Sequence, residues 1–301
     1  MKLKGPSGFI ERLPPSFRAG VWMSGTVISF TCMAVAGREA SFELDTFELM
    51  TYRSFAGFVI VLSLAGLTGR LNRIAFSNLR LHATRNVLHF AATNLWFYAV
   101  ATIPLAQVFA FEFSTPIWAA ILAPLFLNER ITVSRIVTLA VGFLGIMIVA
   151  RPGIIEFSPG LHAAMLCAVG FAGSAVATRM LVRHADVISV LFWMTSMQFA
   201  FAIVLAGHDG DFVLPSRATA LPLIVVSIAG VAAHYCLTSA LRLAPAVVVM
   251  PFDFVRLPLI MVVGLLLYSE AIDSFTVVGG LIILTANYLN IRNEARTHSR
   301  T

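Results

Sequence analysis

The chain has 301 residues, of which 58% are hydrophobic and only 12% are charged. Soluble domains carry about 45–50% apolar and about 25% charged residues, so this chain has too few charges to cover a water-soluble surface. The net charge of +6 does not indicate nucleic-acid binding, because the basic residues lie in short loops and not on one continuous face. The composition therefore predicts a protein that is solvated by a lipid bilayer.

Ten stretches of the chain are long and apolar enough to cross a bilayer as helices, which takes about 20 residues each. Period-2 alternation, the mark of a membrane β-barrel, does not accompany them. The sequence thus predicts an all-α membrane protein with ten transmembrane helices, the third and fourth of which part at Ile103 and Pro104. The predicted spans are 19–37, 48–67, 84–103, 105–127, 131–150, 159–181, 187–207, 220–243, 245–268 and 272–290.

The basic residues predict the orientation of these spans, because cytoplasmic loops carry an excess of Lys and Arg. With ten spans, the opposite loops hold three basic residues, Arg38, Arg151 and Arg217, and most of the acidic ones. We therefore expect a protein of the bacterial inner membrane with both termini in the cytoplasm. Sixteen basic residues fall on the cytoplasmic side: Lys2, Lys4, Arg12, Arg18, Arg70, Arg73, Arg80, Arg85, Arg130, Arg135, Arg179, Arg183, Arg242, Arg292, Arg296 and Arg300.

Two segments align without gaps when the chain is shifted by 141 residues: PLAQVFAFEFSTPIWAAILAPLFLNE at 104–129 and PAVVVMPFDFVRLPLIMVVGLLLYSE at 245–270. Glu112 meets Asp253, and each lies between two phenylalanines. The shift covers five predicted spans, an odd number, so the second half enters the membrane from the opposite side. Such an inverted repeat is a common plan of secondary transporters. The two predicted five-helix halves are 19–150 and 159–290.

At these segments the chain resembles the drug/metabolite transporter superfamily, and in particular its bacterial EamA group. The resemblance covers nearly the whole chain, residues 19–290, and implies ten helices around a central cavity lined mainly by spans 1, 3, 4, 6, 8 and 9. Members of the group export amino acids or other metabolites, or carry S-adenosylmethionine or riboflavin, and segment 85–152 looks most similar to the last two types. The resemblance rests on Leu125-Phe126-Leu127-Asn128-Glu129-Arg130, Gly142-Phe143-Leu144-Gly145, Arg151-Pro152-Gly153, Leu267-Tyr268-Ser269-Glu270 and Gly279-Gly280.

Four charged residues lie inside predicted spans: Arg53, Glu112, Asp253 and Arg256. An ionisable group within the membrane is a functional hypothesis by default. Asp253 and Arg256 share one helix face, which suits either a substrate or proton site or an ion pair for packing. Glu112 has no partner in its own helix, so we expect Arg53 to pair with it unless Arg53 extends to the membrane surface. Glu112 is thus the predicted proton carrier.

Prolines near both acids predict bent or broken helices at mid-membrane, because proline removes a backbone hydrogen bond. Transporters place their binding sites at such breaks. The prolines are Pro116, Pro251 and Pro258.

Polar and aromatic side chains gather in the third and eighth predicted spans. Facing one centre, they would suit a planar or cationic organic solute through stacking and hydrogen bonds. Alternatively, they serve packing or form an aromatic belt at the membrane surface. The residues are His89, Asn94, Trp96, Tyr98, His234 and Tyr235.

The glutamates that end the two repeated segments, Glu129 and Glu270, are predicted to be structural. Each precedes a further span, so we expect each to cap the helix that follows it.

The expected function is the movement of a small organic metabolite across the inner membrane by alternating access. Protons are a further expected partner, and no cofactor, metal or nucleic acid is expected. Enzyme motifs such as GxSxG and HExxH are absent from the sequence, as is any ATPase motif, so transport would depend on ions or on exchange. A scaffold or a sensor is the alternative, although the tails outside the spans are too short for an output domain. The sequence leaves the direction of transport and the oligomeric state open.

Overall fold

The computed structural model describes residues 15–127, 133–152, 154, 157–181, 185–208, 210–243 and 252–298. These residues form helices joined by short loops, with no β-strand among them. Glu129, Pro245 and Pro251 lie outside the described residues. The helices are α2 (Pro15–Ala40), α3 (Thr46–Leu67), η1 (Leu71–Arg73), α4 (Leu79–Thr102), α5 (Leu105–Glu112), α6 (Thr115–Leu127), α7 (Val133–Ala150), α8 (Pro159–Leu181), α9 (Val187–Ala206), α10 (Arg217–Leu243), α12 (Arg256–Tyr268) and α13 (Ser274–His298).

Helix length and apolarity make this a multi-pass membrane protein. Within the described residues, six helical segments are long and apolar enough to cross a bilayer. They are Phe17–Ala40, Thr46–Leu67, Leu105–Phe126, Pro159–Leu181, Val187–Ala206 and Arg217–Ala240. Three shorter apolar helices accompany them: Leu139–Ala150, Arg256–Tyr268 and Ser274–Leu289.

The predicted break between the third and fourth spans is confirmed. Helix α4 ends at Thr102, and Ile103 has an extended backbone with φ −128° and ψ 165°. Pro104, with φ −56°, precedes the first residue of α5. The residue before a proline is driven out of the helical region, which explains why one helix ends here and another begins.

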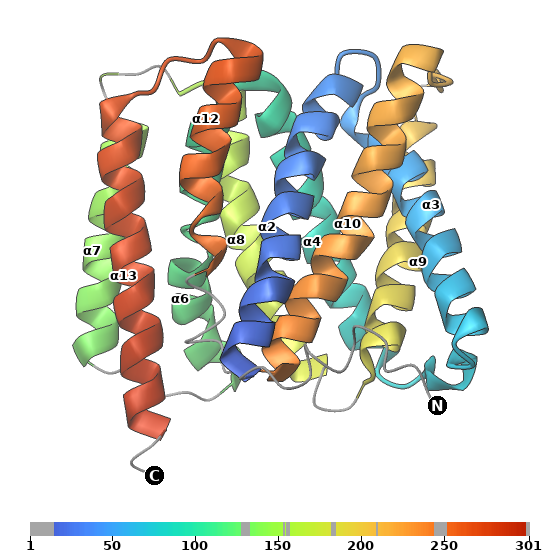
Figure 1. The fold of residues 1–301 in the computed structure, drawn as a ribbon, viewed down its shortest axis with the longest axis horizontal. Helices are drawn as coiled ribbons and strands as arrows, with labels where there is room; N and C mark the ends of the chain where they lie inside the picture. The colour runs from blue at the N-terminus through green and yellow to red at the C-terminus, as the bar shows by residue number, and fades with distance from the viewer. Residues whose placement is uncertain are drawn as a thin grey trace, which may run out of the picture.

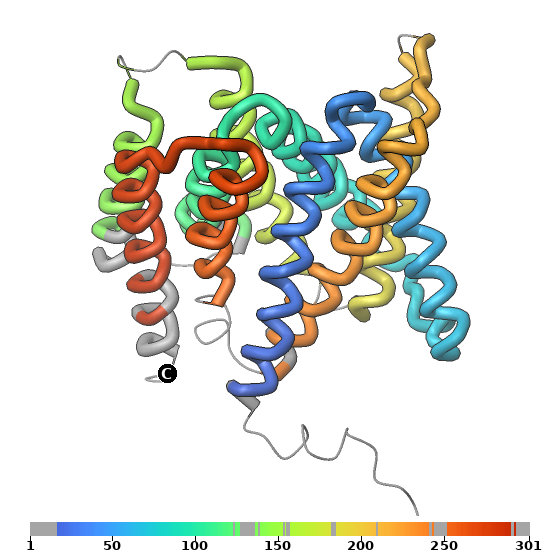
Figure 2. The backbone as a smooth tube through the Cα atoms, turned by 45° about the horizontal axis from the view of Figure 1, so that its top comes forward, coloured from blue at the N-terminus to red at the C-terminus, as the bar shows by residue number. Residues whose placement is uncertain are grey.

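The helices pack in pairs that are far apart in the sequence. Helix α2 lies against α10, α4 against α8, α3 against α9, and α7 against α13, as Figures 1 and 2 show. Helix α5 is largely buried, and α12 packs on it. The start of α2 and the end of α13 lie at the same end of the bundle (Figure 1). Phe109 and Phe111 of α5 are among the largest fully buried side chains.

Two glycines allow the backbones of α7 and α13 to touch. A Cβ atom on Gly279 would lie 2.7 Å from the carbonyl oxygen of Gly145, and one on Gly145 would lie 2.8 Å from that of Gly279. Small residues at such crossings provide close packing between membrane helices, where the hydrophobic effect drives little association. The helix pair at the left edge of Figure 1 therefore depends on glycine.

We expect Gly279→Val to destabilise the protein by at least about 1–3 kcal/mol, because the valine side chain forces α13 away from α7. The change should lower the melting temperature of the purified protein, measured by loss of the monodisperse peak in size-exclusion chromatography after heating. Gly66→Val in α3 is the matched control, since no atom lies within 4 Å of its Cβ position. Equal melting temperatures for both variants would contradict the close crossing.

Candidate transport site

The fourth predicted span is broken at mid-length, where α5 ends and α6 begins. Pro116 has no N–H, so the Glu112 carbonyl has no partner one turn on, and it accepts from Thr115 Oγ1 at 2.6 Å instead. The Phe113 carbonyl accepts from Asn287 Nδ2 of α13 at 2.6 Å. Backbone groups inside a membrane need such replacement partners. The break therefore leaves the Glu112 side chain at a helix end in the core.

The chain turns at the equivalent point of the second half. Phe254 and Val255 form a turn, and α12 begins at Arg256. Pro258 cannot donate to the Phe254 carbonyl, which accepts from the N–H of Leu257 at 3.2 Å. The two turns are 141 residues apart, at 113–114 and 254–255, and an acid precedes each. The predicted breaks are confirmed for the described residues.

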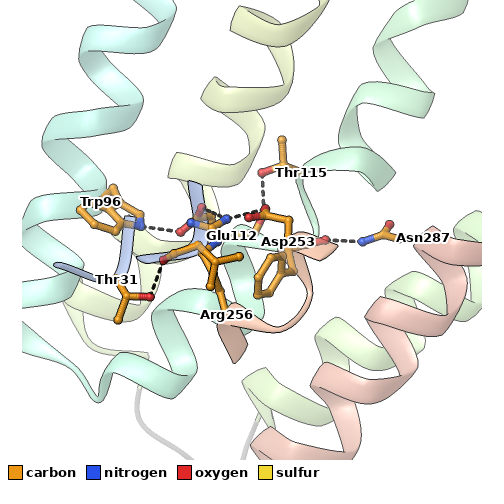
Figure 3. A network of polar contacts seen from close by, with 9 residues as sticks. Thr31, Trp96, Glu112, Thr115, Asp253, Arg256 and Asn287 are labelled. Carbon is orange, nitrogen blue, oxygen red and sulfur yellow. Dashed lines mark hydrogen bonds and ion pairs between the residues drawn. The ribbon is translucent and has the colours of Figure 1, made fainter. Parts of the chain in front are cut away.

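The two acids meet on one guanidinium group. Arg256 Nη2 donates to Asp253 Oδ2 at 2.7 Å and to Glu112 Oε1 at 3.0 Å. The indole Nε1 of Trp96, from α4, donates to the second oxygen of Glu112 at 2.8 Å (Figure 3). Both halves of the chain thus contribute a carboxylate to one charge cluster, which we call the Arg256 cluster: Glu112, Asp253, Arg256 and Trp96.

Aromatic rings surround the guanidinium of Arg256, which is 4% exposed. Its central carbon lies 4.8 Å from the ring centre of Phe30, 5.1 Å from that of Phe113 and 5.3 Å from that of Phe109. The faces of these rings attract the cation and keep water away. Phe113 and Phe254, one from each break, are in edge-to-face contact at 5.9 Å. Charges in this dry setting interact far more strongly than in water.

The Arg256 cluster retains unused hydrogen-bonding capacity. Asp253 Oδ1, Arg256 Nε and Arg256 Nη1 are buried and have no protein partner. Buried polar atoms are nearly always paired, so these three atoms call for partners that a bound water molecule or ligand would supply.

Two histidines lie next to the Arg256 cluster. The rings of His89 in α4 and His234 in α10 are 5.7 Å apart, edge to face. Phe30 contacts His234 at 5.6 Å and therefore joins the histidines to the Arg256 cluster. His89 Nε2 and Asn94 Oδ1 are buried without a partner. The histidine pair and Asn94 extend the polar lining beyond the charges.

The structure separates the other predicted site residues from this centre. Arg53 is not the partner of Glu112, because it lies between α3, α9 and α10, where its Nη1 contacts Met50 Sδ at 3.4 Å. Tyr235 is 52% exposed and packs on Trp22 at the surface. Tyr98 is exposed as well. The prediction of Arg53 as partner failed because it used depth alone, whereas helix phase decides which side chains meet.

Several buried charges escaped the sequence reading. Arg85, assigned to a cytoplasmic loop, is buried in α4 and donates from Nε to Thr178 Oγ1 at 3.1 Å and from Nη1 to Asn86 at 2.8 Å. Arg38 and Glu48 are buried too. For Arg85, a signal was present: it lies four residues before His89, on the same helix face.

Glu270 does not cap the helix that follows it. It accepts from Arg38 of α2 in an ion pair, and its second oxygen accepts from the N–H of Leu105 at 2.9 Å, so it caps α5. Arg38 also donates to the carbonyls of Val100 and Ile103 and lies 4.7 Å over the ring of Tyr268. We call the contacts among Arg38, Leu105, Tyr268 and Glu270 the Glu270 contacts. They join both halves of the chain at one end of the bundle.

A pocket of about 300 Å³ lies beside the Glu270 contacts and is lined by Arg38, Phe42, Thr102, Tyr268 and Glu270, among others. At the same end, the loop carboxylate of Glu43 accepts from Thr219 and from Ser216 of the segment that starts α10. Hydrogen bonds lower the pKa of Glu43 below its usual value, and the bond from Thr219 contributes more than those from Ser216. This end of the bundle is therefore closed by polar contacts between distant segments.

Helix breaks with a charge cluster between them are a feature of membrane transporters. Comparison with known proteins agrees: the sequence profile of the EamA-like transporter family matches residues 18–151 and again 158–292. The chain belongs to the EamA-like transporter family. It is a small-metabolite transporter and not an enzyme.

Characterised relatives carry different metabolites. An S-adenosylmethionine uptake transporter of Rickettsia felis is 25% identical, over 93% of this chain and 94% of that protein. A riboflavin transporter of Rhizobium johnstonii is 30% identical, over 71% of each chain. A pseudopaline exporter of Pseudomonas aeruginosa is 27% identical, over 86% of this chain and 90% of the exporter.

A solved crystal structure has the same fold. It superimposes with a TM-score of 0.65 at 16% identity and covers 93% of this chain and 98% of its own. At this identity the likeness concerns the fold alone.

Proposed function

We propose that the chain is a secondary carrier with ten membrane crossings, built as two inverted five-helix halves, 19–150 and 159–290. Helices α5 and α6 together make the fourth crossing, and α12 completes the ninth. The helix pairs support this plan: exchanging the halves turns the α2–α10 pair into α8–α4, and maps the α3–α9 and α7–α13 pairs onto themselves. Two exchangeable halves around one centre suit alternating access.

We propose that both termini are cytoplasmic. The basic residues favour this orientation, and α2 begins at the end of the bundle where α13 finishes. Reporter fusions at residue 301 and in the loop near residue 210 should then report opposite compartments. The same compartment for both would reject the ten-crossing plan.

The proposed solute carries an amino group and a carboxylate on one carbon, as amino acids and S-adenosylmethionine do. The observation that carries this proposal is the buried, unpaired acceptor of Asp253 next to the unpaired donors of Arg256. An ammonium group can donate to Asp253, and a carboxylate can accept from the planar fork of Arg256. His89, His234 and Phe30 supply faces and polar edges for a planar part of the solute, such as a nucleobase.

We further propose that transport is coupled to protons. The Arg256 cluster has two carboxylates and one guanidinium, so its formal charge is −1. Removing charge from the membrane core is strongly favoured. A proton on one carboxylate can balance the cluster, and so can a solute of net charge +1. A zwitterionic amino acid would therefore be carried together with a proton, whereas S-adenosylmethionine, whose sulfonium adds a positive charge, would exchange for one. Glu112 was predicted as the proton carrier because it has no basic partner in its own helix. Both carboxylates pair with Arg256, so this reason does not single out Glu112 over Asp253.

Uptake into proteoliposomes tests the proposal. We expect S-adenosylmethionine or a neutral amino acid to be transported in preference to riboflavin, which lacks the amino-acid group. Asp253→Asn should lower uptake by about tenfold or more, the loss expected for one charge-assisted hydrogen bond. Asp186→Asn, at the N-cap of α9, is the matched control, because asparagine caps helices as well as aspartate does.

Protein amount is measured for each variant, so that folding and transport are separated. Preference for riboflavin, or full activity of folded Asp253→Asn, would contradict the proposed solute class. Accumulation by the wild type that is indifferent to an imposed pH gradient would reject the proton coupling but leave the solute class standing.

A further inference from the structure

A small cavity lies away from the Arg256 cluster, between α3, α9 and α10, the helices at the right of Figure 1. Its lining includes Arg53 and Ser54 of α3, Thr195 and Gln198 of α9, and Ser227 and Gly230 of α10. A Cβ atom on Gly230 would lie 3.1 Å from both Nε and Nη2 of Arg53, so the guanidinium rests directly against the α10 backbone. The cavity is thus built where three apolar helices turn polar residues toward one another.

Three side chains of this lining have buried atoms without a partner: Arg53 Nε, Ser54 Oγ and Gln198 Nε2. Arg53 is 6% exposed, and the other two are more deeply buried. Each of these atoms can donate a hydrogen bond. Three unpaired donors around one cavity indicate a single acceptor at its centre, because buried polar groups are rarely left unsatisfied.

The size of the cavity limits what it can hold. About 10 Å³ of the cavity is open to the centre of a water-sized particle, which leaves room for one water molecule or one monatomic ion. An organic carboxylate or any metabolite is too large. The cavity is therefore not a second place for the transported solute.

Charge decides between the particles that fit. Within the described part of the chain, no carboxylate forms an ion pair with Arg53, whose contacts include the Met50 sulfur and the ring of Phe97 at 5.9 Å. A buried cation without a counter-charge is costly in free energy. A water molecule would accept from the donors but would leave the charge of Arg53 unbalanced. A monatomic anion accepts from the donors and also balances the charge.

We propose that this cavity binds one small inorganic anion, chloride, held by Arg53, Ser54 and Gln198. The bound anion neutralises Arg53 and ties α3 to α9. Since it binds both helices only in the folded carrier, it stabilises that state more as its concentration rises.

Thermal melting of the purified full-length protein tests the site, with sodium chloride exchanged for sodium gluconate at constant ionic strength. We expect the melting temperature of the wild type to rise with chloride and to saturate. Ser54→Ala and Gln198→Leu each remove one donor and should weaken the apparent chloride affinity by about tenfold. Ser196→Ala is the matched control: it lies on α9 outside this lining, and its hydroxyl donates to the Phe192 carbonyl at 2.6 Å.

Bromide soaked into crystals gives an independent reading, since its anomalous signal should appear within hydrogen-bonding distance of Arg53 Nε. A wild-type melting temperature that does not distinguish chloride from gluconate would overturn the proposal. A chloride effect in Ser54→Ala and Gln198→Leu as large as in the wild type would also overturn it, because it would indicate a general salt effect. The same holds if crystals grown in chloride show density for a water molecule alone in the cavity.

Discussion

Replacing Arg256 with glutamine is expected to abolish transport and to destabilise the protein by about 3–5 kcal/mol, the usual cost of breaking a buried ion pair. The change leaves Glu112 and Asp253 close together without a counter-charge. It also removes the cation from the faces of three phenylalanine rings. Uptake into proteoliposomes, together with the amount of folded protein, measures both effects.

Arg256→Lys separates charge from geometry. A lysine keeps the positive charge but lacks the planar fork that reaches two carboxylates and a solute. We expect Arg256→Lys to recover much of the stability, while uptake stays at least about tenfold below wild type. A folded Arg256→Gln variant with normal uptake would show that the Arg256 cluster serves neither folding nor transport.

Glu270→Gln is expected to open the end of the bundle that the Glu270 contacts close. The amide keeps the shape of the side chain but removes the charge that balances buried Arg38. Under the proposed alternating access, these contacts break when the site faces this end, so weakening them shifts the population toward that state. A bias of about 1.4 kcal/mol would raise the open fraction about tenfold.

Cysteine labelling measures this shift. Thr102 lines the pocket beside the Glu270 contacts, so Thr102→Cys in a background without the native cysteines should react faster with a membrane-impermeant maleimide when Glu270→Gln is added. Glu39→Gln is the matched control, because Glu39 is exposed and accepts a hydrogen bond from Tyr268 at 2.8 Å that is separate from the Arg38–Glu270 ion pair. Equal labelling rates with and without Glu270→Gln would contradict the prediction that the Glu270 contacts close this end of the bundle.

The sequence determined the membrane class, the helix ends near Pro104 and the broken segments at the two acids. These features depend on local properties: about 20 apolar residues suffice to cross a bilayer, and a proline disrupts its helix wherever the helix packs. The repeat could also be recognised from the sequence, because Glu112 in the first half and Asp253 in the second half occupy equivalent positions. The transporter function followed from these residues and from the family resemblance.

Only the tertiary structure decided which charges meet. Glu112 pairs with Arg256, 144 residues away, and not with Arg53, although both arginines lie within predicted spans. Likewise, Glu270 caps α5, 165 residues before it, and not the helix that follows it. Hydropathy gives the depth of a residue in the membrane but not the direction in which its side chain points. That direction depends on the rotation of each helix against its neighbours, which packing across the whole chain fixes.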